Sequence, residues 1–488
     1  MTALDVVNTL SGYLWGTPLL VTVLFGGIFY TLATKFFTFR YFGHMIKHTF
    51  GTLLKKDESK EKAAGKISPF EAVAVAIGGT VGVGNIGGVS TAIATGGPGA
   101  VFWLWLWGLC GMTIKTAEVS LAVYFRSKDE SGNFYGGSTY YMEKGIGKAM
   151  GLKIWKVLAL IFFVGMFAGM IGGAQTYTIA EGLHTSFGIP MLPFTICYAA
   201  FIILVVWKGI HSIANFATKV VPFMCLIYLV GGVIIIAKNL GTIPHVFGMI
   251  FSDAFTGTAA VGGFAGAAFA QVVKTGVARS IYSNEAGWGS SPFAHASANT
   301  PHPVRQGLWG SFEVFVDTIL VCSITALSIL CAGVWDSGIM GASLAIEAYS
   351  TAFGTIGGNF ITICVFLFGM TTSTGWCAYY EVMIRQLFSK NMKLRENFVK
   401  LYKLVFMLPG VYVVWLAETG GSGPELIWAI ADCTNAVPTF ANIVALLFLS
   451  KQFLMLLNDY KARYLGIGTV DPNFKVFYDT EDQPVAVG

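Results

Sequence analysis

A glycine-rich stretch at residues 78–88, GGTVGVGNIGG, is well suited to hold a small charged molecule. Six of these eleven residues are glycine, and the polar Thr80 and Asn85 lie among them in an otherwise apolar run. Glycine weakens a helix, so the pattern predicts a break. A break frees backbone amides, which suit a carboxylate at a half-helix N-terminus, and carbonyls, which suit an ammonium or Na⁺. Close packing of helices on small residues is the alternative explanation for these glycines.

Two further stretches could contribute to the same chemistry. Residues 261–266, VGGFAG, form a second glycine interruption in an apolar segment. Four consecutive hydroxyl side chains, Thr371 to Thr374, precede Trp376. Hydroxyl oxygens are ligands for hard cations such as Na⁺. The same hydroxyls could instead bond only to carbonyls of their own helix.

Two opposite charges, Lys115 and Glu118, lie three residues apart inside an apolar segment. A charge at the bilayer centre costs about 2.5 to 3.5 kcal/mol on insertion scales, so each needs a partner. The spacing predicts that they pair with each other on one helix, as a structural ion pair rather than a proton relay. Other candidate partners are Glu313, Asp317, Glu347 and Asp432.

The composition places these residues in a membrane protein. Of the 488 residues, 55% are hydrophobic and 12% are charged, against roughly 25% charged residues in a soluble domain. The eight cysteines occur singly, with no Cys-x-x-Cys pair and no metal-ligand spacing, which argues against an enzyme with a metal or nucleophile site. The net charge of +5 lies in short loops, so nucleic acid is not implied.

About eleven apolar segments are long enough to cross a bilayer as helices. They fall near residues 14–35, 69–95, 99–125, 155–184, 191–207, 215–237, 252–279, 305–333, 344–381, 402–417 and 424–449. The ninth has room for extra helix outside the bilayer. We expect an all-α membrane fold with a leading helix and linker (1–67), a first five-helix repeat (68–238), a second (239–450) and a cytoplasmic tail (451–488).

The basic residues predict the orientation. Lys and Arg gather in alternate loops, at residues 40–66, 126–156, 208–219, 279–305 and 385–403. By the positive-inside rule these loops are cytoplasmic, which places the N-terminus outside and the C-terminus inside the cell membrane.

The glycine breaks fall at corresponding places in the two halves, in the second and seventh segments, with four unbroken segments after each. With the orientation above, the two segments run in opposite directions, as in an inverted repeat. This arrangement predicts a transporter with its site at mid-membrane. A channel would need a continuous polar lining or a charged ring, whereas the polar residues cluster at one depth.

Several long motifs resemble the alanine or glycine:cation symporter family. They are residues 79–103 with Lys115, Glu118 and Tyr124 to Arg126, residues 283–292 (SNEAGWGSSP), residues 302–307 (HPVRQG) and residues 314–318 (VFVDT). The resemblance extends over nearly the whole chain. It implies the fold of the bacterial leucine transporter with an extra leading helix, and sodium-coupled symport of alanine or glycine without a covalent cofactor. Proton coupling in the same fold is the alternative.

The resemblance also implies site residues. The carbonyls of Gly78 and Val81 would face sodium, with Thr371, Thr372 and Asn85 as further sodium ligands. The substrate would contact the first broken helix at Thr80, Gly82, Val83, Gly84 and Asn85, and the second at Gly262, Gly263 and Phe264.

Further pocket residues are implied on the ninth and fourth segments. Thr372 would also touch the substrate and Trp376 would form a wall of the pocket. Gln175 would bond the ligand and Phe167 would limit the pocket volume. Asn284 and Glu285, just past the seventh segment, have the character of cap or gate residues on the cytoplasmic side.

Overall fold

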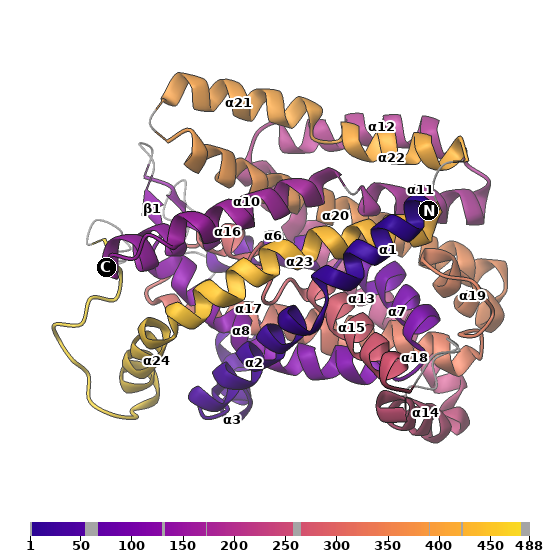
Figure 1. The fold of residues 1–488 in the computed structure, drawn as a ribbon, viewed down its shortest axis with the longest axis horizontal. Coiled ribbons are helices and arrows are strands. Elements are labelled where there is room, and N and C mark those ends of the chain that lie inside the picture. The colour runs from indigo at the N-terminus through magenta and orange to yellow at the C-terminus, as the bar shows by residue number, and fades with distance from the viewer. Residues whose placement is uncertain are drawn as a thin grey trace.

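A computed structural model describes residues 2–53, 67–128, 132–171, 173–256, 265–389, 391–420 and 423–479. This part of the chain is almost entirely helical (Figure 1). Its one strand pairing joins β1 (Ser127–Lys128) and β2 (Phe134–Tyr135), which are antiparallel. Seven helices are long and apolar enough to cross a membrane, or up to nine spans if each of two bent pairs is counted as one.

The N-terminal helices form the first bent pair. Helix α1 (Ala3–Leu14) and α2 (Thr17–Ala33) meet at 47°, and the short helices α3 (Phe37–Arg40), α4 (Phe42–His48) and α5 (Phe50–Leu53) follow. The expected first segment, 14–35, therefore corresponds to α2, with an additional helix before it.

The second bent pair contains the glycine-rich stretch. Helix α6 (Pro69–Thr80) begins with a capping box, because the Glu71 amide donates to Ser68 Oγ (3.2 Å) and the Ser68 amide to Glu71 Oε2 (2.9 Å). The π-helical turn η2 (Gly84–Gly88) and helix α7 (Val89–Gly96) follow after a bend of 43°.

The remaining helices of the first half surround this pair. They are α8 (Ala100–Tyr124), α9 (Ser138–Tyr141), the π-helical η3 (Met142–Ala149), α10 (Trp155–Ile171), α11 (Ala174–Phe187), α12 (Met191–Val206) and α13 (Ile210–Lys238). Gly173 adopts a left-handed φ of 60° between α10 and α11. The expectation that the fourth segment is unbroken is therefore wrong, because a left-handed residue ends the regular helix.

The second half has the same helical character. It contains η4 (Leu240–Thr242), α14 (Ile243–Thr256), α15 (Ala265–Asn284), α16 (Pro292–His295), α17 (Pro303–Val314), the π-helical η5 (Phe315–Cys322), α18 (Ser323–Ala332), α19 (Ala342–Phe353), α20 (Thr355–Leu387), α21 (Met392–Val405), α22 (Leu408–Glu418), α23 (Pro424–Phe448) and α24 (Ser450–Leu465). Gly354, with φ 63°, separates α19 from α20. The ninth span is therefore α20, and the expected start at residue 344 was too early.

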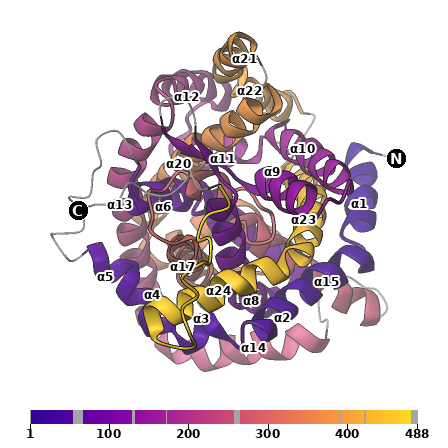
Figure 2. The ribbon, with the colours of Figure 1, turned by 90° about the vertical axis from the view of Figure 1, so that its left-hand side faces the viewer.

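The site is positioned by the most enclosed helices. Helix α8 packs against α15 and α17, and α20 packs against α6 and α11. Helices α12, α21 and α22 lie at the periphery, as the end-on view shows (Figure 2). The interior therefore consists of α6, α8, α15, α17 and α20. Of these, α6 and α20 carry the predicted site residues Gly78, Thr80, Thr371, Thr372 and Trp376.

Candidate functional site

The predicted break in the glycine-rich stretch is present. Helix α6 stops at Thr80, residues 81–82 are not helical, and η2 starts at Gly84. All residues from 78 to 88 are buried. The predicted second break, with Gly262, Gly263 and Phe264, lies outside the described residues, between α14 and α15.

Asn85 braces the break from within. Its Oδ1 accepts a hydrogen bond from the Gly82 amide at 2.7 Å, and its Nδ2 donates to Asp317 Oδ1 at 2.7 Å. Its carbonyl accepts from Thr325 Oγ1, also at 2.7 Å. Asn85 therefore ties the non-helical residues to η5 and α18, and its side chain is engaged by protein atoms on both ends.

Asp317 is a carboxylate buried among neutral donors. Asp317 Oδ2 accepts from Ser283 Oγ and from Thr318 Oγ1, each at 2.8 Å, and Oδ1 accepts from Asn85. Among the described residues no Lys or Arg forms an ion pair with it. An isolated buried carboxylate is costly unless it is neutralised by a proton or a cation. A proton or a cation from outside this cluster is therefore needed to neutralise Asp317.

Helix α20 lies very close to the broken helix. A Cβ added to Gly375 would lie 3.0 Å from the Gly79 Cα, so a side chain at this position would require the two backbones to move slightly apart. Thr372 Oγ1 reaches across to the Gly78 carbonyl oxygen at 3.2 Å and also contacts the Phe368 carbonyl oxygen at 3.0 Å. The structure therefore brings together Gly78 and Thr372, two of the predicted sodium ligands.

Two other predicted hydroxyls, the sodium ligand Thr371 and the substrate contact Thr80, point differently. Thr371 Oγ1 donates to the carbonyl oxygen of Phe368 (2.9 Å) in its own helix, and Thr80 Oγ1 donates to that of Ala76 (3.1 Å). The back-bonding explanation thus describes these two side chains. The Thr371 Cβ nevertheless lies 3.3 Å from the position of a Cβ added to Gly78, so Thr371 remains beside the break.

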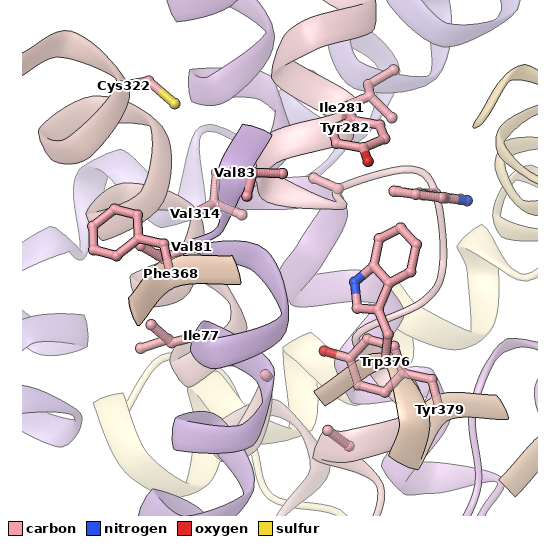
Figure 3. Packing of buried hydrophobic residues seen from close by; sticks show 14 of the residues in the cluster. Ile77, Val81, Val83, Ile281, Tyr282, Val314, Cys322, Phe368, Trp376 and Tyr379 are labelled. Atoms are coloured by element: carbon pink, nitrogen blue, oxygen red, sulfur yellow. The ribbon is translucent and has the colours of Figure 1, made fainter. Parts of the chain in front are cut away.

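The predicted pocket residues Gln175, Thr372 and Trp376 line one cavity of about 40 Å³, together with Tyr380. A smaller cavity of about 10 Å³ also touches Gln175 and Trp376, and adds Tyr282. Figure 3 shows the Trp376 and Tyr282 rings beside the broken helix at Val83. Such a cavity accommodates a few water-sized groups, so only a small ligand fits without rearrangement.

The first broken helix adjoins this cavity. A Cβ added to Gly82 would lie 2.1 Å from Thr372 Oγ1, and one added to Gly84 would lie 3.0 Å from the Tyr282 ring. Tyr282 Oη accepts from Gln175 Nε2 at 3.0 Å. Phe167 does not line either cavity and instead packs against the Tyr380 ring, with centroids 5.6 Å apart. Its influence on pocket volume is therefore through Tyr380.

Comparison with known proteins assigns the family. A sequence model of the sodium:alanine symporter family matches residues 1–474. The chain belongs to the sodium:alanine symporter family. The sodium/alanine symporter AgcS of Methanococcus maripaludis is 36% identical over 457 residues, covering 92% of this chain and 95% of that protein. A probable sodium/glutamine symporter of Bacillus subtilis, GlnT, is 32% identical, covering 93% and 90%.

Two solved structures share the fold at low sequence identity. The Eremococcus coleocola manganese transporter gives a TM-score of 0.52 at 13% identity, covering 83% of this chain and 82% of that one. MhsT in complex with L-phenylalanine gives 0.50 at 14%, covering 80% and 98%. This sodium:alanine symporter family member is thus a membrane-embedded transporter of the leucine-transporter fold type, and not an enzyme.

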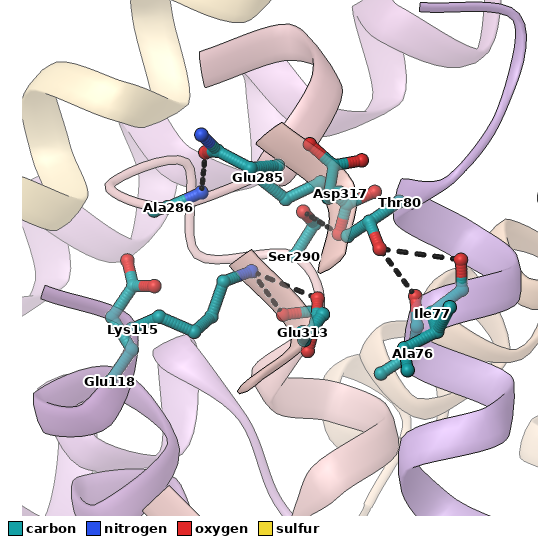
Figure 4. A network of polar contacts seen from close by, with 12 residues as sticks. Ala76, Ile77, Thr80, Lys115, Glu118, Glu285, Ala286, Ser290, Glu313 and Asp317 are labelled. Atoms are coloured by element: carbon teal, nitrogen blue, oxygen red, sulfur yellow. Dashed lines mark hydrogen bonds and ion pairs between the residues drawn. The ribbon is translucent and has the colours of Figure 1, made fainter. Parts of the chain in front are cut away.

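The pairing expected for Lys115 in this symporter is wrong. Lys115 Nζ forms an ion pair with Glu313 Oε1 of α17 at 3.2 Å and donates to Ser291 Oγ at 2.6 Å (Figure 4). Glu118 instead accepts from the Gly287 amide (3.0 Å) and from Asn442. The two side chains leave α8 toward different neighbours, because cross-helix partners are available to both. Glu313 was among the alternative partners, and it is the one found.

Of the two predicted cap or gate residues, Glu285 contacts the pocket wall, which spacing alone does not indicate. Asn284 Oδ1 accepts from the Ala286 amide at 2.8 Å, as a cap does. Glu285 Oε1 accepts from the pocket residue Trp376 (Nε1, 2.7 Å), and Oε2 accepts from Ser290 Oγ (2.6 Å). Glu285 holds a left-handed φ of 55°, which is strained for a non-glycine residue. The loop after α15 therefore fixes the orientation of Trp376.

Proposed function

We propose that this protein is a sodium-coupled symporter for a small neutral amino acid, alanine or glycine, that works by alternating access. The observation that carries the proposal is the buried break in α6, where Thr372 of α20 meets the Gly78 carbonyl at 3.2 Å beside a small cavity that Thr372 also lines. In the structure the Thr372 hydroxyl donates to this carbonyl. Oxygen ligands contributed by two helices at one place suit Na⁺.

The sodium site in this proposal uses the carbonyls of Gly78 and Val81 and the hydroxyls of Thr371 and Thr372. Val81 ends α6 with non-helical dihedrals (φ −72°, ψ 89°). Its amide still donates to the Ile77 carbonyl, but the Asn85 amide, which would bond the Val81 carbonyl in a continuous helix, donates to Gly82 instead. The Thr hydroxyls now donate to carbonyls of α20, and each would turn a lone pair toward a bound ion without leaving its rotamer.

The substrate site lies on the other side of the break. The amides of Val83 and Gly84 belong to the first turn of a half-helix, where no acceptor exists inside the helix, and they suit a carboxylate. Gln175, Thr372 and Trp376 line the adjoining cavity. Gly262, Gly263 and Phe264 are assigned to the same site from the sequence.

The size of the cavity favours a small substrate. Trp376 and Tyr380 line it, and Glu285 accepts a hydrogen bond from Trp376. AgcS is described as a sodium/alanine symporter, which agrees with a small ligand, whereas GlnT is described as a sodium/glutamine symporter. Alanine and glycine are the substrates that need least enlargement here.

Alternating access follows from the repeat organisation proposed from the sequence, residues 68–238 and 239–450 after the leading region 1–67, with 451–488 as a cytoplasmic tail. We assign the N-terminus to the outside of the cell membrane and the C-terminus to the cytoplasm. The broken helices would then rock against the surrounding helices, exposing the site to each side in turn.

Proton coupling is the second candidate, and Asp317 favours it. The carboxylate lies one hydrogen bond from Asn85 and has no cationic side chain paired with it among the described residues. A Bacillus subtilis relative, 33% identical, is described as a putative sodium/proton-dependent alanine carrier. Either a proton or a second sodium ion would neutralise Asp317.

Uptake by the purified protein in liposomes tests both candidates. Labelled alanine or glycine is supplied with an inward sodium gradient at equal pH, or with an inward proton gradient in sodium-free buffer. We expect accumulation with the sodium gradient and little with the proton gradient alone. Accumulation driven by protons without sodium would replace the first candidate by the second, and uptake that never exceeds equilibration would reject symport.

A further inference from the structure

A groove of about 720 Å³ lies between the end of α2, helix α3 and the C-terminal helix α24. Lys35 and Arg40 line one side, and Lys461 lies on α24. His44 Nε2 and Tyr460 Oη, 2.9 Å apart, join the two sides, and the Lys461 ammonium lies 5.2 Å from the centre of the Phe37 ring. Helices α3 and α24 lie at the same edge of the molecule (Figure 2). The groove is therefore formed by elements in fixed contact.

The groove carries more positive charge than its own residues neutralise. Within the described ranges, none of its three cations forms an ion pair. Asp459 and Asp471 also line the groove. Asp459 is engaged by Arg463 (2.7 Å) and His302 (3.2 Å), and Arg463 also donates to the Asp471 carbonyl (3.3 Å). Arg463 thus neutralises Asp459, whereas the Asp471 carboxylate accepts from the Asn473 amide (2.9 Å) and has no cationic partner among the described residues. The three cations Lys35, Arg40 and Lys461 therefore face one unpaired carboxylate, and the groove keeps an excess of positive charge.

The three cations repel one another. Burial, followed by the nearby charges of Lys35 and Arg40, lowers the pKa of the Lys461 ammonium. Lys35 and Phe36 both hold left-handed dihedrals, with φ 57° and 58°, which non-glycine residues rarely adopt. A strained turn that places like charges close together needs a further stabilising interaction. An anion between the cations would provide one.

The surroundings of the groove are apolar. Ile467, which lines it, is 45% exposed, and Phe36 is 44% exposed. The adjoining helix α2 exposes Phe25, Ile28 and Leu32 along a span assigned to the membrane. A ligand that satisfies both features has a negatively charged head and long apolar chains.

We propose that this groove binds an anionic phospholipid, with its phosphate between Lys35, Arg40 and Lys461 and its acyl chains along the outer face of α2. Lys and Arg near a membrane surface each attract anionic lipid by about 1 kcal/mol, roughly a fivefold change in affinity. The site is separate from the transport site, so the inference does not depend on the proposed substrate or coupling ion.

Native mass spectrometry of the full chain in detergent, titrated with dioleoylphosphatidylglycerol or dioleoylphosphatidylcholine, tests the proposal. The protein is expected to bind phosphatidylglycerol at least about tenfold more tightly than phosphatidylcholine. The single variants Arg40→Gln and Lys461→Gln each reduce that preference about fivefold, and the combined K35Q/R40Q/K461Q variant abolishes it. Lys451→Gln, an exposed change on the same helix outside the groove, leaves it unchanged.

Three results would overturn the proposal. The first is equal binding of the two lipids by the unaltered protein, and the second is unchanged phosphatidylglycerol preference in the single variants. The third is complete displacement of phosphatidylglycerol by excess inorganic phosphate, which would make the groove a site for free phosphate. The wild-type comparison and the conservative variant Lys461→Arg, which should keep the preference, decide the question even if the combined variant does not fold.

Discussion

Two buried polar clusters flank the site, and they differ in how their charge is balanced. In the first, Lys115 of α8 is paired with Glu313 of α17, and His295 also contacts Glu313 at 2.6 Å. In the second, the hydrogen-bond donors to the Asp317 carboxylate within the described ranges are Asn85, Ser283 and Thr318, which are neutral. Both carboxylates are fully buried. The first cluster contains its own cation, whereas the second must obtain one from outside.

This difference separates a structural role from a functional one. A buried ion pair that is complete holds helices in register and has nothing further to bind. A buried carboxylate without a cation is stable only when a mobile cation or proton is present, and in a transporter that requirement links ion occupancy to the conformation of the helices around it. The break braced by Asn85 is attached directly to the incomplete cluster. The comparison can be tested by removing charges from each cluster in turn.

The largest effect is expected from Lys115→Met, which leaves Glu313 buried without its ammonium partner. Breaking one side of a buried ion pair costs about 3 to 5 kcal/mol, so the unfolding temperature in detergent should fall strongly. The double variant Lys115→Met with Glu313→Gln should recover most of this loss, since no unpaired charge remains. Lys451→Met, on the surface, serves as the control. A double variant no more stable than the single would contradict the ion-pair assignment.

Asp317→Asn should give the opposite pattern. Removing this charge leaves no buried cation unpaired, so the unfolding temperature should stay close to that of the unaltered protein. Gradient-driven uptake in liposomes should fall about a hundredfold. With a neutral side chain at position 317 no cation or proton is required there, so ion occupancy no longer controls the conformation. Uptake that remains normal and sodium-dependent would mean that Asp317, like Glu313, is only structural, and the contrast between the clusters would disappear.

Asn85→Ala is expected to weaken transport by an intermediate amount. The variant removes the acceptor of the Gly82 amide and one donor to Asp317, each worth about 1 to 2 kcal/mol when buried. Both the sodium and amino-acid concentrations for half-maximal uptake should rise, because the break loses its brace on both sides. A variant with unchanged values for both would refute the assigned role of Asn85.

The sequence predicted the break well because the cause is local. Six glycines around Thr80 and Asn85 weaken the helix whatever surrounds it, and the structure shows the interruption at residues 81–82. The family resemblance then implied that Gln175, Thr372 and Trp376 share a pocket, and they line one cavity although α11 and α20 lie far apart in the sequence. Periodicity and spacing alone would not have joined them.

The charge partners could not be predicted in this way. The i,i+3 spacing of Lys115 and Glu118 favoured a local pair, but the rotation of α8 against α17 and α23 offers each a partner on another helix. Asp317 lies 232 positions from Asn85, and only the packed fold brings the two together. Its presence in an apolar segment was a sufficient signal to consider it, but as a partner for Lys115 rather than as part of the site.

The smallest effect is expected from removing single hydroxyls of α20, which tests whether Thr372 or Thr371 is the more important sodium ligand. Thr372→Val removes the hydroxyl that reaches the Gly78 carbonyl, whereas Thr371→Val removes one that bonds only within α20 and to Met224. The two substitutions are identical in kind and adjacent in the chain. We expect Thr372→Val to raise the sodium concentration for half-maximal uptake about tenfold, the loss of one hydrogen bond or ligand, and Thr371→Val to raise it less. If Thr371→Val had the larger effect, Thr371 rather than Thr372 would be the principal hydroxyl ligand of the ion, and the contact made by Thr372 would be a structural link comparable to the Lys115 pair.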